Sequence, residues 1–268
     1  MNIGLMSAIE RNNILIKGKG TQAMLFAHGF GCDQNMWRYV TPAFEADYKM
    51  VLFDHVGAGT SDLTAYSADK YSQLEGYAAD IVEICEELKL DEVIFVGHSV
   101  SSVIGIMAYL KAPHLFKSLI MIGPSPSYIN EGEYVGGFTH EQITELLESL
   151  DNNHLGWSMA MAPVIMANPD RGELAEELAN SFCRTDPEIA KQFAKTTFLS
   201  DSRDLLPKVK IPTLILQCAE DVIAPEEVGV FMHQKMKDSQ FVLMEATGHC
   251  PNLSAPEETV QAMKQFLA

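Results

Sequence analysis

Short apolar runs alternate along the chain with longer segments whose apolar residues recur every three to four positions. The short runs are rich in Val, Ile, Leu and Met, as is typical of parallel strands covered on both faces, and the longer segments indicate amphipathic helices. The pattern predicts strands at residues 22–27, 50–54, 92–97, 118–123, 213–218 and 240–245. It predicts helices at residues 71–90, 100–112, 226–236 and 256–267. We also expect an antiparallel hairpin at the start, with residues 7–10 and 13–17 flanking Arg11-Asn12.

The alternation stops between Gly123 and Ile211, where only helical periodicity is found. Four helical pieces are predicted in this stretch, at residues 140–150, 153–166, 173–182 and 187–199. Helices inserted between two strands of such a sheet are expected to cover the strand ends, where open α/β folds bind ligands. We therefore predict an α/β fold with a mostly parallel sheet flanked by helices. Its core comprises residues 1–123 and 212–268, and residues 124–211 form a four-helix cap.

Composition narrows the possible partners. The 268 residues carry 19 Lys and Arg against 36 Asp and Glu, a formal net charge of −17, so nucleic acid and anionic membranes are poor partners. The five cysteines are odd in number and lack metal-finger spacing, which favours reduced thiols in a cytoplasmic protein. Residues 1–11 lack the pattern of a secretory signal, and no apolar run approaches the ~20 residues that span a bilayer.

The strongest chemical signal is the run Gly97-His98-Ser99-Val100-Ser101, between a predicted strand and a predicted helix. It matches the nucleophile elbow G-x-S-x-G except at the last position, where Ser101 replaces glycine. In this turn the serine hydroxyl projects above the sheet. The alternative is an ordinary strand–helix junction that contains a serine.

A second run, residues 27–31 (AHGFG), closes the first predicted strand of the parallel set. Loops of the H-G-x-G type supply one N–H group to the oxyanion hole, and the residue after the nucleophile supplies the other. The predicted donors are the N–H groups of Phe30 and Val100. We expect His28 to hold the loop rather than to react.

The acid and the base should follow the nucleophile in the chain order Ser, Asp or Glu, His. Asp221 comes just after the predicted strand 213–218, and His249 lies between the last strand and the last helix. These two residues and Ser99 are the predicted catalytic residues, with Glu220 the rival for the acid. Five other histidines are interpreted as surface or capping residues: His55, His114, His140, His154 and His233.

Two resemblances to other motifs fail. Residues 57–62 (GAGTSD) follow a strand, but they lack the third glycine of a dinucleotide-binding loop and place Asp62 where a pyrophosphate would be repelled. His140-Glu141 opens like a zinc-protease helix, but Thr144 occupies the position of the second histidine. No cofactor and no metal are expected. A serine nucleophile also argues against epoxide-hydrolase or dehalogenase chemistry, which requires a carboxylate.

Over nearly its whole length the chain resembles the RsbQ-type regulators of the bacterial sigma-B stress response and the related strigolactone and karrikin receptors of plants. The resemblance depends on residues 28–34, 54–62, 97–101, 136–138, 198–203 and 248–251. Residues 192–195 and 214–219 favour the bacterial type, whereas Ser101 is the variant found in the plant receptors.

The resemblance implies an α/β-hydrolase fold whose V-shaped cap covers a small apolar pocket. The residues that it implies as pocket lining are Phe30, Tyr128, Phe138, Ile143, Leu146, Trp157, Met161, Phe198, Val222 and Ile223. It also implies work with a PAS-domain PP2C-type phosphatase that releases a stress sigma factor.

Three functional hypotheses remain open from the sequence. The favoured one is a selective serine hydrolase for a small hydrophobic ester or lactone that serves stress signalling. The others are a general carboxylesterase with no partner, and a ligand-binding signalling module with little turnover. An intact serine, histidine and aspartate set argues against the last.

Overall fold

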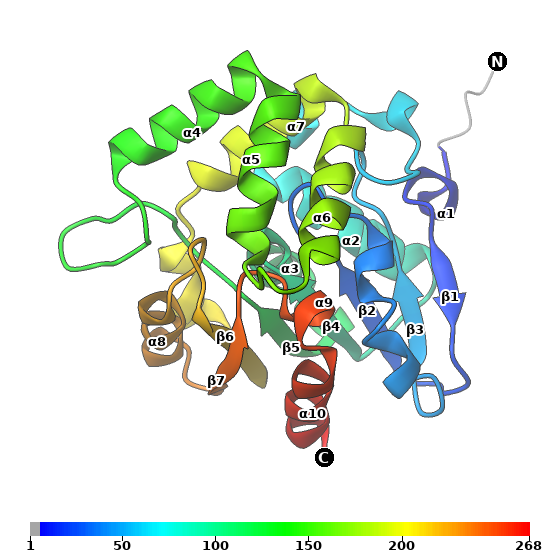
Figure 1. Ribbon diagram of the computed structural model, residues 1–268. Coiled ribbons are helices and arrows are strands. Elements are labelled where there is room, and N and C mark those ends of the chain that lie inside the picture. Colours follow the sequence, from blue (N-terminus) through cyan, green and yellow to red (C-terminus); the bar gives the residue numbers. More distant parts are fainter. Residues whose placement is uncertain (1–5) are drawn as a thin grey trace.

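The computed structural model describes residues 6–268, which form a seven-stranded sheet covered by helices (Figure 1). The strand order is β1-β3-β2-β4-β5-β6-β7, and only β1 runs antiparallel to its neighbour. The strands are β1 Leu15–Lys17, β2 Ala23–Ala27, β3 Lys49–Leu52, β4 Val93–His98, β5 Phe116–Ile122, β6 Thr213–Glu220 and β7 Ser239–Thr247. The mostly parallel sheet predicted from the apolar runs is thus confirmed.

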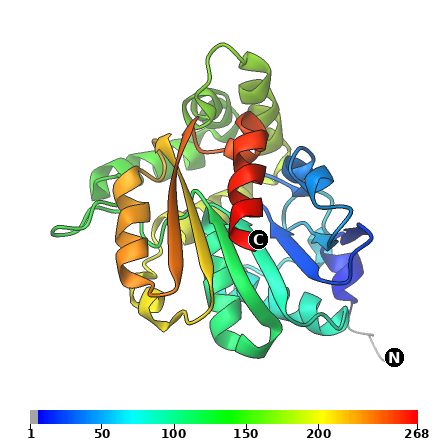
Figure 2. The same ribbon diagram turned by 90° about the horizontal axis from the view of Figure 1, so that it is seen from below.

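Alternate residues of the central strands enter two different apolar layers. Leu25 and Val51 belong to the layer under α2, α3 and α8, whereas Met24 and Phe26 belong to the layer under α10 and the cap. Successive side chains of a strand point to opposite faces, so a strand that is apolar throughout must be covered on both. Figure 2 shows α8 and α10 on opposite sides of β6 and β7. The flanking helices are α1 Ala8–Arg11, α2 Leu74–Glu87, α3 Val100–Lys111, α8 Glu226–Lys235, α9 Pro251–Ser254 and α10 Pro256–Leu267.

Four helices lie between β5 and β6 and form a cap over one end of the sheet (Figure 1). Local signals set their starts. Thr139 and Gln142 form a capping box at the first helix, and Asp186 accepts N–H bonds at the last. Their bounds are α4 His140–Asn152, α5 His154–Met166, α6 Gly172–Arg184 and α7 Pro187–Phe198. These bounds agree with the four predicted helical pieces to within a few residues.

The predicted N-terminal hairpin is wrong in its first half. Residues 8–11 form the short helix α1, because the Ser7 side chain accepts the Ile9 N–H and the Glu87 carboxylate accepts the Ala8 N–H at 2.7 Å. Strand β1 pairs with β3 instead of with a preceding strand. Across residues 6–268, no helix is both long and apolar enough to cross a membrane.

Candidate functional site

Ser99 lies in the turn between β4 and α3, and its backbone is strained. Its φ of 57° and ψ of −126° are values that residues with a side chain rarely adopt. The strand and the helix cross so closely that a Cβ on Gly97 would lie 2.7 Å from the Ser101 carbonyl oxygen. The glycine in the elbow sequence is therefore needed for the crossing, and the crossing holds the serine at the end of the strand beneath the cap.

Three side chains from distant parts of the chain form one continuous hydrogen-bonded chain. Ser99 Oγ lies 2.7 Å from His249 Nε2, and His249 Nδ1 lies 2.7 Å from Asp221 Oδ2. All three residues are buried. The structure therefore brings together the three residues that the sequence predicted as nucleophile, base and acid.

Asp221 is fixed by the backbone that follows it. Its Oδ1 atom accepts the N–H groups of Ile223 at 2.8 Å and Ala224 at 3.2 Å, which leaves Oδ2 for His249. The rival acid, Glu220, has an exposed side chain at the end of β6, and its carbonyl oxygen accepts the Gly248 N–H. The structure thus pairs the His249 imidazole with Asp221, whereas Glu220 contacts the loop that carries His249 through its backbone alone.

His98, the second residue of the elbow sequence, forms a hydrogen bond to the backbone of His249. Its Nε2–H donates to the His249 carbonyl oxygen at 2.7 Å. Burial lowers the pKa of His98 to about 3, so the ring is neutral. The sequence predicts no role for this residue, and its position between Gly97 and Ser99 is the signal that points to it.

The interpretation of His55 as a surface or capping residue is wrong, and so is that of His154. His55 is 1% exposed, because its ring packs against Phe53 and Tyr77 and its Nε2 bonds to Ser101. His154 is buried in the first turn of α5, and the side chain that caps this helix is that of Asn153. The other three histidines in that group are exposed, as predicted: His114, His140 and His233.

The two predicted oxyanion donors lie on segments that flank Ser99. Val100 is the first residue of α3, so its N–H is among the helical donors that have no partner within the helix. Phe30 follows Gly29, where an added Cβ would come within 3.2 Å of Ser99 Cβ, so this loop packs directly on the nucleophile turn. His28 holds the loop, as expected, since its Nε2 accepts the His55 N–H at 3.0 Å.

A small cavity of about 30 Å³ adjoins Ser99 beneath the cap. Five residues of the predicted lining border it: Phe30, Tyr128, Trp157, Phe198 and Ile223. It is also bordered by seven residues outside the predicted lining: Cys32, His98, Ile165, Leu178, Phe182, Thr197 and Cys250. Leu178 and Phe182 lie on the buried face of α6, so the apolar stripe of that helix was the available signal. The polar side chains among the walls are those of Ser99, His249, His98, Tyr128 and Thr197, and the other walls are apolar side chains and the thiols of Cys32 and Cys250.

The structure places the other five predicted lining residues away from the cavity. Ile143 is fully buried in the packing of the cap, and Val222 is 52% exposed on the outside of its loop. The remaining three are partly buried against the apolar layer beneath the cap: Phe138, Leu146 and Met161. The lining implied by the resemblance is wrong at these positions. Their side chains pack against other apolar side chains or face solvent, and do not face the cavity.

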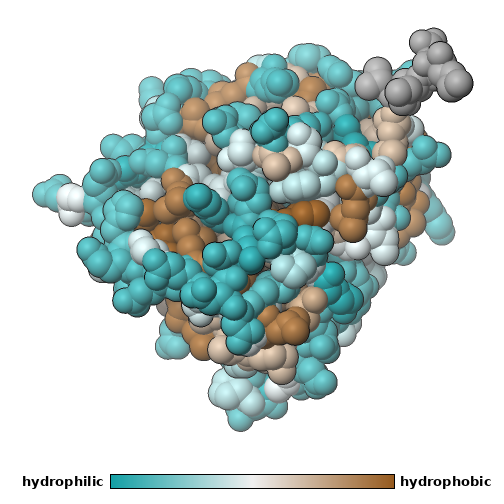
Figure 3. Space-filling view, turned by 90° about the horizontal axis from the view of Figure 1, so that it is seen from above, coloured by the Kyte–Doolittle hydropathy of each residue, from teal (hydrophilic) through white to brown (hydrophobic). Residues whose placement is uncertain are grey.

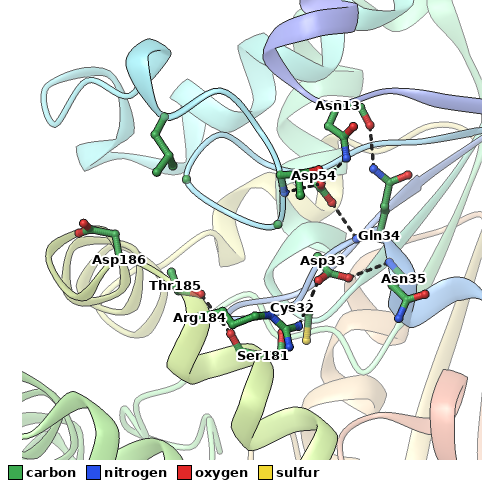
Figure 4. Close-up of a pocket in the computed structure, with 14 residues that line it drawn as sticks. Asn13, Cys32, Asp33, Gln34, Asn35, Asp54, Ser181, Arg184, Thr185 and Asp186 are labelled. Atoms are coloured by element: carbon green, nitrogen blue, oxygen red, sulfur yellow. Dashed lines mark hydrogen bonds and ion pairs between the residues drawn. The ribbon is translucent and has the colours of Figure 1, made fainter.

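A larger, polar cleft of about 510 Å³ lies between core loops and the α6–α7 junction (Figure 4). Of the three carboxylates that line it, Asp54 accepts bonds from Gln34 N, Asn13 Nδ2 and Thr60 N. These bonds hold Asp54 in place, and Ser99 and His249 border the smaller cavity rather than this cleft. Within residues 6–268, no three His, Cys, Asp or Glu side chains gather as a metal centre requires.

A parallel sheet with an inserted helical cap, a strained serine turn and a buried His–Asp pair together define the α/β-hydrolase class. The family model described as alpha/beta hydrolase fold matches residues 22–256, and the chain belongs to this family.

Curated relatives and solved structures agree with this assignment. The karrikin insensitive 2 receptor CA of Petunia hybrida is 36% identical over 96% of both chains. A strigolactone esterase of Arabidopsis thaliana is 33% identical over 97% of both. The solved structure of a hydrolase from Oleispira antarctica is 43% identical, with a TM-score of 0.95 over 97% of this chain and 96% of that one. The chain is therefore homologous to the plant receptors that it was predicted to resemble.

Proposed function

We propose that this protein is a serine hydrolase that cleaves a small hydrophobic ester or lactone. The observation that carries the proposal is the hydrogen-bonded chain from Asp221 through His249 to Ser99, beside a small apolar cavity. A serine hydroxyl is a weak nucleophile on its own and needs an adjacent base that is itself oriented by a third group. The site holds all three groups within hydrogen-bond distance.

The proposed reaction uses these groups in two steps. Ser99 Oγ attacks the ester carbonyl carbon while its proton passes to His249 Nε2, and the oxyanion that forms accepts the N–H groups of Phe30 and Val100. His249 then returns the proton to the departing alcohol oxygen, which leaves an acyl group on Ser99. A water molecule attacks the acyl carbon, again with His249 as base, and releases the carboxylic acid. With a lactone, acid and alcohol remain in one product.

Cavity size supports a small substrate. Drug-sized ligands occupy pockets of about 300–1,000 Å³, whereas the cavity at Ser99 measures about 30 Å³. A substrate therefore has to displace cap side chains, and each added carbon increases the displacement. Phe198 is one of these side chains, and its ring centroid lies 5.1 Å from that of Tyr128 and 6.3 Å from that of Phe30.

Phe198→Ala is accordingly expected to extend activity toward longer acyl chains. Removal of the ring opens space beside the cavity, at a cost to stability of about 3–5 kcal/mol. The measurement is kcat/KM for acetyl, butyryl and octanoyl aryl esters, at matched folded fraction. Ile143→Ala is the control, because this residue is buried in the same cap but away from the cavity. It should lower Tm and leave the chain-length profile unchanged. An unchanged profile in Phe198→Ala would assign that side chain to packing alone.

Covalent labelling tests the proposed nucleophile. A fluorophosphonate is expected to add once to the protein, and the Ser99→Ala variant is expected to show no adduct by intact-mass spectrometry. The reagent phosphonylates serines that have an oriented base, so the other buried serines should not react. A folded wild-type protein that shows no adduct would contradict the proposal, and an adduct retained in Ser99→Ala would place the nucleophile elsewhere.

A signalling role extends the proposal beyond catalysis. Its support is the homology to plant receptors and the resemblance to the sigma-B regulators, which suggests a PAS-domain phosphatase partner for a cytoplasmic protein. The cap also exposes apolar side chains of α5, namely Leu155, Met159 and Val164, and Figure 3 shows hydrophobic patches on this side of the molecule. Exposed apolar patches are typical of interaction sites. A neighbouring gene for a PAS-domain phosphatase would favour this role over that of a general esterase without a partner.

The similarity to the karrikin insensitive 2 receptor CA of Petunia hybrida favours a second candidate function, in which binding matters more than turnover. The two candidates differ in steady-state behaviour. A hydrolase turns over many ester molecules per protein molecule, whereas a receptor with little turnover releases about one equivalent of alcohol and then stops. Measuring the released alcohol against time over a tenfold range of protein concentration separates them.

A further inference from the structure

The loop of residues 28–31, called here the oxyanion loop, carries the Phe30 N–H in the Gly29–Phe30 peptide. No peptide bond of the described chain is cis. In a planar trans peptide the C=O and the N–H point in opposite directions. Groups that fix the Gly29 carbonyl therefore also fix the direction of the Phe30 N–H.

The Gly29 carbonyl is held by the His28 ring and by Cys32, the residue that follows the loop. It accepts the Cys32 N–H at 3.3 Å and lies 2.9 Å from His28 Nδ1. Because His28 Nε2 accepts the backbone N–H of His55, the ring proton of neutral His28 must be on Nδ1. The imidazole thus donates to the Gly29 carbonyl, and its tautomer is set by the segment that follows β3.

Ser101 provides the second anchor. Its hydroxyl donates to the His28 carbonyl oxygen at 2.5 Å and lies 2.8 Å from His55 Nε2. A serine hydroxyl has one hydrogen, so the bond to His55 must be donated by the imidazole Nε2–H. Ser101 and His55 are 0% and 1% exposed. Burial also lowers the pKa of His55 well below its ordinary value, which keeps this ring neutral.

We infer that Ser101 and His55 are positioning residues that hold the oxyanion loop so that the Phe30 N–H faces the substrate oxygen at Ser99. This inference rests on the proposed serine-hydrolase function. Ser101 stands where the elbow sequence has its last glycine, and a glycine there has no hydroxyl to bond to the His28 carbonyl. The serine is thus a working part of the site in this protein rather than a tolerated exception.

The test compares two adjacent buried serines of α3. Ser101→Ala removes the bond to the oxyanion loop, whereas Ser102→Ala removes a bond of 2.9 Å to the Gly97 carbonyl and leaves the loop untouched. A misdirected oxyanion donor weakens binding of the transition state and not of the bound ester. We therefore expect Ser101→Ala to lower kcat for an aryl acetate about 10- to 100-fold, with KM changed less than about twofold. Ser102→Ala should keep kcat within about twofold.

His55 supplies an independent variant. His55→Gln retains an N–H donor and is expected to keep more of kcat than His55→Leu, which removes it. The double variant Ser101→Ala/His55→Leu should lose no more than about the larger single loss, because both changes act through the same carbonyl. Comparison of His55→Gln with His55→Leu tests the positioning role even if Ser101→Ala fails to fold.

The outcomes distinguish failure of the positioning role from failure of the proposed hydrolase function. If Ser101→Ala loses no more kcat than Ser102→Ala, or if His55→Leu and His55→Gln retain full kcat, the positioning role is wrong while the hydrolase remains. If the folded wild-type protein neither hydrolyses aryl esters nor reacts with a fluorophosphonate, the proposed function itself fails.

Discussion

Ser99→Ala and His249→Ala should each lower kcat toward a short-chain aryl ester by about 10⁶, and the double variant should lose no more than either single one. A nucleophile and its base act as one unit, so removal of either abolishes the covalent route and removal of the second changes nothing further. The 2.7 Å contact between Ser99 Oγ and His249 Nε2 is the structural basis of this expectation.

Steady-state kinetics with all three variants and the wild-type protein provide the measurement. His140→Ala is the control, because this histidine is exposed at the start of α4 and far in sequence from the site. It should retain wild-type kcat. Losses that multiply in the double variant would mean that the serine and the histidine act in separate steps, and the proposed unit would then be wrong.

The elbow shows why part of the site could be predicted from the sequence. A strand, a sharp turn and a helix follow one another within residues 93–111, so the position of Ser99 is set by local signals. Asp221 and His249 also follow directly after strands. The parallel strands β4, β6 and β7 end at the same edge of the sheet, so Ser99, Asp221 and His249 all lie at that edge. Because β5 lies between β4 and β6, the loops after β6 and β7 must also extend toward Ser99 to bring the three side chains into contact.

Burial of single polar side chains could not be predicted in the same way. The sequence predicts His55 to be a surface or capping residue, but its burial comes from Phe53, Tyr77 and Ser101, which are brought together only by the tertiary fold. The prediction that Val222 lines the cavity is wrong for a related reason. Val222 is adjacent to Ile223, which does line the cavity, and the direction of side chains in an irregular loop follows no fixed period.

The acid of the site gives the second large expected effect. Asp221→Asn should lower kcat by about 10⁴ with little change in fold. Oδ1 of Asp221 accepts two backbone N–H groups, from Ile223 and Ala224, and an amide NH₂ cannot take that place. The asparagine oxygen must therefore occupy the Oδ1 position, which turns the NH₂ group toward His249 Nδ1.

That orientation reverses the tautomer of the base. An NH₂ donor requires a lone pair on His249 Nδ1, so the ring proton moves to Nε2, the atom that faces Ser99. The imidazole then has no lone pair with which to accept the serine proton. Glu220→Gln is the matched control, since this carboxylate is one residue away and exposed, and it should keep kcat within about twofold. Kinetics of the two variants with one aryl ester make the comparison. If Glu220→Gln proved the more damaging change, Asp221 would not be the acid that orients His249.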